Sequence, residues 1–250
     1  MAVPSPPETV HLRIVVWNCN MRLHDKTGRL RALRPDLAVI PECACPEVLF
    51  RRSLDLIPGD FVWGGTNPRK GLMVMAFGPW RLRADRSHQP RSGTTLPLHV
   101  SGPASFRLLA VWGLPLWAHR RRDPPPEPLG RAIERLAPFL SDAPAIVAGD
   151  FNRTLVGRRR NGSSVASVLA RRLEALGFVS GYHHDRGVGH GEETEPTFCR
   201  YRRLPDRHHA DHLFVDRATA ARVRRVEIGY APRWISTSDH MPLVLELELD

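Results

Sequence analysis

Short apolar runs separated by turn-forming residues constrain the fold of this chain more than any other feature. The runs are four to seven residues long, the usual length of a buried strand, and the last alternates leucine with glutamate as a half-exposed strand does. They cover residues 12–17, 37–40, 71–77, 106–112, 145–148, 210–215 and 243–249. Helical spacing occurs at residues 26–33, 130–140 and 165–176, the last followed by Gly177 as a stop signal. Strands and helices without strict alternation predict a layered α+β domain whose sheets are buried inside helices.

The length of the chain, 250 residues, is compatible with one domain that buries a large core. We expect residues 11–250 to form that domain and residues 1–10 to be a disordered tail. No apolar run approaches the roughly 20 residues that cross a bilayer, and the start lacks the pattern of a secretory signal. The four cysteines form no Cys-x-x-Cys pair, so reduced thiols are expected, with a Cys43–Cys45 site as a minor alternative. These features predict a cytoplasmic monomer without membrane contact or an obligate protein partner.

The net charge of +10 comes almost entirely from arginine, because Lys26 and Lys70 are the only lysines. Arginine binds phosphate through two parallel hydrogen bonds, and a basic chain attracts polyanions. GC-rich coding is an alternative explanation for the ratio of arginine to lysine. It does not account for the excess of positive charge, which favours nucleic acid or another phosphorylated partner.

The segment around Asp150 and Asn152 is the first candidate for chemistry. The two residues follow a buried run and stand two apart, so in extended chain their side chains point the same way. Asp150 could hold a metal or a water molecule, and Asn152 could donate to a phosphate oxygen. Glycine, aspartate and asparagine also form turns, so a simple turn is the alternative for this segment taken alone.

Four other strand ends carry similar residues. Asn18 and Glu42 follow the first two runs, Asp211 stands at the start of the sixth, and Asp239 and His240 precede the last. Carboxylates suit Mg²⁺, and an imidazole next to a carboxylate suits proton transfer. A single turn does not explain five strand ends of this kind, which together predict one shared site.

The order and spacing of these segments resemble a known family. They are Trp17-Asn18-Cys19-Asn20, Pro41-Glu42, Gly149-Asp150-Phe151-Asn152, Asp211 before an apolar strand, and Ser238-Asp239-His240. From Arg13 to the C-terminus the chain resembles the endonuclease/exonuclease/phosphatase superfamily, which includes pancreatic deoxyribonuclease, abasic-site endonucleases, inositol-phosphate phosphatases and bacterial sphingomyelinases. The resemblance implies a four-layer α/β sandwich, in which two mixed sheets pack face to face and are flanked by helices. It places the site where strand ends meet at one edge.

The resemblance also implies a metal site. Glu42 would bind the divalent metal, usually Mg²⁺ with Mn²⁺ as a substitute, and Asn18 would support it. Asp239 would act as a second metal ligand or as a carboxylate that orients the site.

Roles in the reaction follow from the same resemblance. Asp150 would orient or deprotonate the attacking water, and Asn152 would help hold the phosphate. His240 would contact the phosphate or transfer a proton, and Asp211 would orient His240. Asp150 and His240 are therefore competing candidates for the general base.

One position departs from the family pattern. The family usually has His or Tyr after the strand that precedes the Gly-Asp-x-Asn segment, and here Trp112 stands there. An indole donates a hydrogen bond but carries no catalytic proton, so His119 is a candidate replacement. Arg158, Arg159 and Arg160 follow the catalytic segment and are expected either to grip a nucleic-acid backbone or to be solvated.

These features predict a Mg²⁺-dependent nuclease or phosphodiesterase acting on nucleic acid, with DNA favoured. One alternative is hydrolysis of a small or lipid phosphoester on the same fold, and another, favoured by Trp112, is a nucleic-acid-binding module with weak catalysis.

Histidines elsewhere in the chain offer a separate metal-site hypothesis. A zinc site at His208 and His212 is a minor alternative, because their spacing suits a helix while the following residues predict a strand. His183, His184 and His190 are expected to be solvated in a long polar loop over residues 183–209.

Overall fold

Two six-stranded sheets form the centre of the molecule. The computed structural model describes residues 9–53, 55–88, 93–114, 127–152, 156–158 and 164–249. The first sheet has the order β15 (Val223–Ile228), β16 (Leu243–Leu249), β1 (Val10–Val16), β2 (Leu37–Cys43), β4 (Lys70–Ala76) and β3 (Asp60–Asn67). The second has the order β11 (Phe178–Ser180), β14 (Asp211–Asp216), β8 (Ala145–Asp150), β7 (Phe106–Trp112), β6 (Thr95–Ser101) and β5 (Arg81–Ala84). Both sheets are mixed, because β1–β2 and β7–β8 are parallel and the other pairs are antiparallel.

The central strands are buried on both faces. Ile14 and Val16 of β1 share one core with Ile146 and Ala148 of β8. Val15, between them, packs with the helices outside its sheet. Successive residues of a strand point to opposite faces, so continuous apolar runs are what a sheet covered on both sides requires. The inter-sheet core therefore receives every second residue of these strands.

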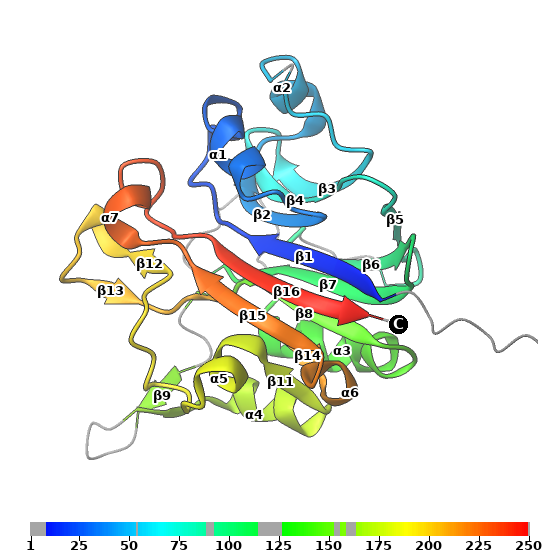
Figure 1. Ribbon diagram of the computed structural model, residues 1–250, viewed down its shortest axis with the longest axis vertical. Coiled ribbons are helices and arrows are strands. Elements are labelled where there is room, and N and C mark those ends of the chain that lie inside the picture. The colour runs from blue at the N-terminus through cyan, green and yellow to red at the C-terminus, as the bar shows by residue number, and fades with distance from the viewer. Residues whose placement is uncertain are drawn as a thin grey trace, which may run out of the picture.

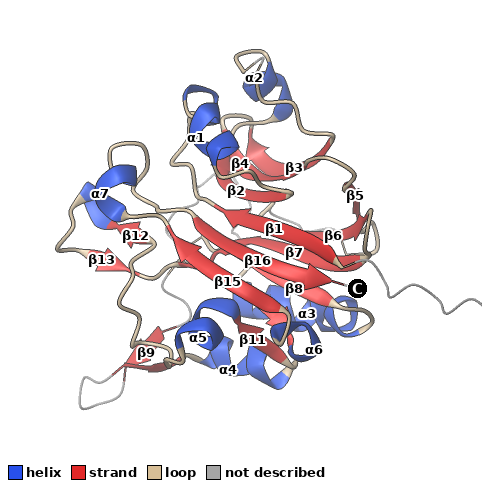
Figure 2. Cartoon of the chain, viewed as in Figure 1, coloured by secondary structure: helices blue, strands red, loops and turns tan. Residues whose placement is uncertain are grey.

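Helices cover the two outer faces and complete the predicted four layers (Figure 1). On the second sheet, α3 (Leu129–Ser141) and α4 (Val168–Ala175) contribute to an apolar cluster with β7 and β8. On the first, α1 (Thr27–Ala32) and α2 (Pro46–Phe50) contribute Leu30 and Leu49 to a third cluster. The remaining helical elements are two 3₁₀ turns (Leu23–Asp25 and Arg200–Arg202), α5 (Gly181–Arg186), α6 (Arg217–Ala220) and α7 (Ala231–Trp234). Two two-stranded ribbons complete the described chain: β9 (Val156–Arg158) pairs with β10 (Ser164–Ala166), and β12 (Phe198–Cys199) pairs with β13 (Arg207–His208). Figure 2 shows the helices outside the sheets.

All seven apolar runs are strands, and the sandwich predicted from the sequence is confirmed. Five strands of the two six-stranded sheets were not predicted, namely β3, β5, β6, β11 and β15, because they are short or interrupted by glycine, proline or charge. The four short strands of the two ribbons were not predicted either. The helix predicted from residue 165 begins at Val168, since β10 occupies the preceding residues. The long loop predicted over residues 183–209 is wrong in part, because α5, β12 and β13 lie within it.

All four cysteines are free and buried. Burial raises the pKa of the Cys43 thiol well above its ordinary value, which disfavours the thiolate that a Cys43–Cys45 metal site needs. Among the described residues, no helix has the length and apolar content that crossing a bilayer requires.

Candidate active site

Several of the predicted site residues meet at one edge of the sandwich. Trp112 at the end of β7 lies opposite Asp150 at the end of β8, and Asp150 lies opposite Asp211 at the start of β14. Leu108, Ala110 and Trp112 alternate into the inter-sheet core, and the same period places Asp150, Asp211 and Asn18 on the inward side of their strands. The pleat of four strands thus directs four side chains into one space between the sheets.

Gly149 brings β8 close to β7 immediately before Asp150. Its φ is +148°, and a Cβ there would lie 1.9 Å from the carbonyl oxygen of Val111. The chain then turns at Asn152, which has a φ of +53°. Asn152 donates its backbone N–H to Asp150 Oδ1 at 2.7 Å and its side-chain amide to the Gly113 carbonyl oxygen. The predicted turn is therefore present, and it positions Asp150.

Asp150 and His240 face each other inside the site. Asn18 donates its side-chain amide to Asp150 Oδ2 at 2.9 Å, and His240 Nε2 lies 4.0 Å from the same oxygen. The other ring nitrogen, Nδ1, donates to Asp211 Oδ2 at 2.7 Å. All four side chains are almost completely buried. The imidazole of His240 thus lies between two carboxylates. Asp211 forms a direct hydrogen bond with it, and Asp150 lies 4.0 Å away.

The backbone around this group is fixed by further hydrogen bonds. Ser238 Oγ donates to the Asn18 carbonyl oxygen at 2.8 Å and accepts from the His240 N–H at 3.0 Å. Trp17 donates its indole N–H to the His240 carbonyl oxygen at 3.1 Å. The Asp211 N–H donates to Thr197 Oγ1 at 2.8 Å. Two of these bonds hold the Ser238-Asp239-His240 segment against the Trp17-Asn18 segment.

Burial and charge set the protonation states. Burial lowers the pKa of His240, but the carboxylates of Asp211 and Asp150 outweigh it and raise that pKa to about 10. Burial raises the pKa of Asp150 to about 6, against the opposing effect of the His240 charge. At neutral pH the site therefore holds an imidazolium beside a carboxylate that accepts a proton readily.

Two further carboxylates line the rim of this site. Glu42 ends β2 at a φ of +61°, and its carboxylate pairs with Lys70 Nζ at 3.2 Å. Cys19 Sγ lies 3.5 Å from the Glu42 carbonyl oxygen, so Glu42 adjoins the Asn18 segment. Asp239 accepts from the Asn20 side-chain amide at 2.7 Å. Asp239 is thus next to His240 in the chain, and Glu42 lies on β2 beside the Asn18 segment.

The two lysines are site residues that the sequence motifs did not indicate. Lys70 Nζ lies 5.3 Å above the ring of Trp112. Lys26 donates to the carbonyl oxygens of Cys19 at 2.5 Å and Met21 at 3.0 Å, and so braces the loop after β1. The sequence contained one indication of their role. They are the only two lysines, and the other positively charged side chains that give the net charge of +10 are arginines.

Several predicted residues are not tested by the geometry. His119, Arg159 and Arg160 lie outside the described residues, and of Arg158 only the backbone is described. His208 pairs with Asp206 at 2.9 Å on β13 and takes no part in the site.

Comparable arrangements of the two sheets are found in solved structures. An AP endonuclease from Archaeoglobus fulgidus is 18% identical with a TM-score of 0.65, and the match covers 94% of this chain and 98% of that one. The chain has the endonuclease/exonuclease/phosphatase fold. Two other structures with this fold are a 3′ phosphatase from Neisseria bound to a product DNA hairpin (17% identical, TM-score 0.64, 95% and 100% covered) and an AP endonuclease from Leishmania major (12% identical, TM-score 0.68, 96% and 88% covered). Searches of family models and of curated protein sequences found no match.

In this endonuclease/exonuclease/phosphatase fold, two donor sets are candidates for a metal. Asp150, Asp211 and His240 place ligand atoms within 4.8 Å of one another, and Asp211 Oδ1 has no hydrogen-bond partner. The imidazolium of His240 already balances half of the charge of the two carboxylates without an ion. Glu42 and Asp239 also offer hard oxygen donors, the type that Mg²⁺ prefers, and Glu42 already pairs with the Lys70 ammonium. The rim carboxylates therefore offer oxygen donors alone, whereas the buried group includes an imidazole.

Proposed function

We propose that this chain is a divalent-metal-dependent nuclease or phosphodiesterase that hydrolyses phosphoester bonds in nucleic acid, with DNA as the favoured substrate. The observation that carries the proposal is the buried group of Asn18, Asp150, Asp211 and His240 at the edge of the sandwich. It combines a proton acceptor and a buried positive charge, which hydrolysis of a phosphodiester requires.

Asp150 is the general base in this proposal. Its pKa of about 6 lies close to neutral pH, where a carboxylate is both ionised and able to accept a proton. Asn18 and the Asn152 N–H each bind one of its oxygens and so fix its orientation toward a water molecule. His240 is charged at neutral pH, which suits contact with a phosphate oxygen rather than base catalysis. The same charge supports Asp150 over His240 as the base.

Glu42 and Asp239 would hold the metal, with Asn18 supporting the site. A bound Mg²⁺, or Mn²⁺ in its place, would neutralise charge on the non-bridging phosphate oxygens. Asp211 keeps the imidazolium charged and oriented, because it accepts from Nδ1 and leaves Nε2 free to face the substrate. Asn152 lies beside the base and would help hold the same phosphate.

The substrate class is supported by charge and by the similar structures. The net charge of +10 favours a polyanion, and a 3′ phosphatase with this fold was solved with a product DNA hairpin. That structure also makes removal of a terminal 3′ phosphate from DNA a second candidate reaction. A monomeric state and a location in the cytoplasm stay predictions from the sequence.

A substrate panel tests the proposal. The purified protein is incubated with plasmid DNA, a duplex with an abasic site, a duplex ending in a 3′ phosphate, RNA, and small phosphoesters, with Mg²⁺, Mn²⁺ or chelator. We expect cleavage of a DNA substrate that chelator abolishes and Mg²⁺ restores. Asp150→Asn should lower the rate by about 10² to 10⁴-fold, the usual contribution of a positioned acid or base.

Each contrary outcome has a distinct meaning. Equal cleavage by wild type and by Asp150→Asn or His240→Ala would refute the assigned site. DNA binding that persists in chelator, without turnover under any metal, would support the non-enzymatic alternative. Phosphate release from small phosphoesters alone would move the substrate away from nucleic acid.

A further inference from the structure

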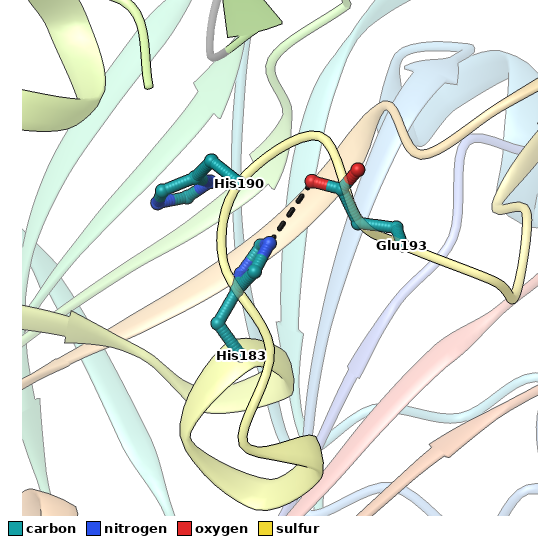
Figure 3. A group of neighbouring side chains, drawn as sticks. All are labelled: His183, His190 and Glu193. Atoms are coloured by element: carbon teal, nitrogen blue, oxygen red, sulfur yellow. Dashed lines mark hydrogen bonds and ion pairs between the residues drawn. The ribbon is translucent and has the colours of Figure 1, made fainter. Parts of the chain in front are cut away.

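A second group of titratable side chains lies outside the site, on α5 and the segment that follows it. His183, His190 and Glu193 place one ligand atom each within 4.8 Å of the others (Figure 3). His183 Nε2 lies 2.9 Å from Glu193 Oε1, and the rings of His183 and His190 are 4.0 Å apart between centroids. The expectation that His183 and His190 are solvated is wrong, because their side chains are only 9% and 7% exposed. His184 alone of the three is exposed.

Two more imidazoles adjoin this group, His212 on β14 and His209 two residues before that strand. The ring of His212 stacks 6.0 Å from that of His183, and the ring of His209 lies 4.8 Å from that of His212. His212 is completely buried, and neither of its ring nitrogens has a hydrogen-bond partner. His190 Nδ1 and His209 Nε2 also lack partners. Buried polar atoms are normally paired, so four unpaired imidazole nitrogens in one place indicate that a ligand is missing.

The donor set identifies the class of ligand. Two imidazoles and one carboxylate suit zinc and related divalent transition metals, whereas Mg²⁺ and Ca²⁺ prefer oxygen donors only. Burial, followed by the neighbouring His183, lowers the pKa of His190 to about 4, and burial lowers the pKa of His212 well below its usual range. These imidazoles are therefore neutral at neutral pH, which is the form that binds a metal.

We propose that His183, His190 and Glu193 bind a zinc ion beside His212 of β14, and that this ion fastens the segment after α5 to α5 itself. Zinc bonds of about 2.1 Å bring tetrahedral ligand atoms to about 3.4 Å from one another, so modest side-chain rotations complete the site. Ser180 Oγ lies 2.7 Å from His183 Nδ1, which leaves Nε2 to the metal, as outer partners of metal-bound histidines do.

This zinc site is connected to the candidate active site through one strand. His212 and Asp211 are neighbours on β14, so their side chains lie on opposite faces of the sheet. The segment that carries Glu193 continues to Thr197, whose hydroxyl accepts from the Asp211 N–H at 2.8 Å. The zinc therefore has a structural role, since it braces the loop that positions Asp211 without touching the substrate. The proposal does not depend on the hydrolase activity.

The test measures metal content and stability instead of turnover. The full chain is stripped with chelator and titrated with Zn²⁺ in millimolar Mg²⁺, so that Mg²⁺ competes for the rim carboxylates. We expect one equivalent of tightly bound zinc by elemental analysis. With Co²⁺ in its place, we expect the intense visible absorption of a tetrahedral site. At 100 times the dissociation constant, zinc should raise the midpoint of thermal unfolding by about 5 to 10 °C.

Matched variants locate the ion. His190→Ala and Glu193→Gln should each lose the zinc equivalent and the thermal shift. His184→Ala, which removes an exposed histidine of the same helix, should keep both. Asp239→Asn should also keep both, because it alters only the rim of the candidate active site.

Three results would overturn the proposal. The first is a wild-type chain that binds no zinc in the presence of Mg²⁺. The second is zinc binding that Asp239→Asn abolishes. The third is full zinc binding by both single variants, Glu193→Gln and His190→Ala. Should His190→Ala fail to fold, the Co²⁺ spectrum of wild type against Glu193→Gln still decides the question.

Discussion

The pairing of Asp211 with His240 has the most measurable consequence in the site. Their 2.7 Å hydrogen bond is fully buried, and with Asp150 it raises the pKa of His240 from 6.5 to about 10. At 1.36 kcal/mol for each pKa unit, the folded protein favours the imidazolium by about 5 kcal/mol more than water does. Because burial alone would lower this pKa, the carboxylates supply the whole effect.

Asp211→Asn removes the charge and keeps the shape of the side chain. The asparagine oxygen still accepts from Nδ1, so the ring stays in place while its cationic form loses an ion pair. An opposite charge at this distance usually changes a pKa by about 1 to 3 units, so the pKa of His240 should fall from about 10 to between about 7 and 9. His240 is charged below its pKa, and the basic limb of activity should therefore move down by the same amount. At pH 7 at least about half of His240 would still be charged, so we expect a loss of no more than about twofold there and a much larger loss at pH 9.

The assay is the pH dependence of kcat/KM on the best DNA substrate, together with an NMR titration of the imidazole of His240. Asp85→Asn is the matched control, because Asp85 also pairs with a histidine, His99, at 2.8 Å but away from the site. It should leave the basic limb unchanged. The reasoning would be refuted if Asp211→Asn kept both the wild-type basic limb and the wild-type NMR pKa of His240. The charge of Asp211 would then not be what keeps His240 protonated.

Three further predictions concern the same region. Activity should fall about tenfold for each pH unit below about 6, because burial raises the pKa of Asp150 to about 6 and only its ionised form accepts a proton; a flat profile from pH 4 to 7 in kcat/KM would contradict this role. Gly149→Ala should lower the free energy of unfolding by more than about 4 kcal/mol in urea denaturation, because the new Cβ would meet a backbone oxygen 1.9 Å away. Gly28→Ala, in α1 with nothing within 4 Å of the new atom, should instead raise stability by up to about 1 kcal/mol, and equal effects of the two changes would refute the close approach of β7 and β8. Lys70→Met should reduce the slope of log affinity for DNA against log salt by about one if Lys70 binds a phosphate, and an unchanged slope would restrict it to contacts within the protein.

The local pattern of apolar residues in the sequence was enough to predict seven strands of the two sheets and the motif residues at their ends. The seven predicted strands show as apolar runs because neighbouring residues in each of them are buried together on the two faces of the sheet. Strands such as β3 and β15, which are only partly buried, carry no such signal and depend on hydrogen bonding to β4 and β16. Their existence is therefore a property of the assembled sheet.

The sequence by itself determined which chemical groups stand at the strand ends, since that placement follows from the order of residues along the chain. The tertiary structure decided how these groups behave. Asn18 meets Asp150 across 132 residues, and His240 meets Asp211 across 29, and it is burial with these distant partners that sets which of them carry a proton. The same applies to the histidines near α5. In the sequence they indicate a polar loop. In the folded chain they are buried, and the ring of His183 stacks on that of His212 in β14. Burial depends on which residues pack together and not on which residues follow one another.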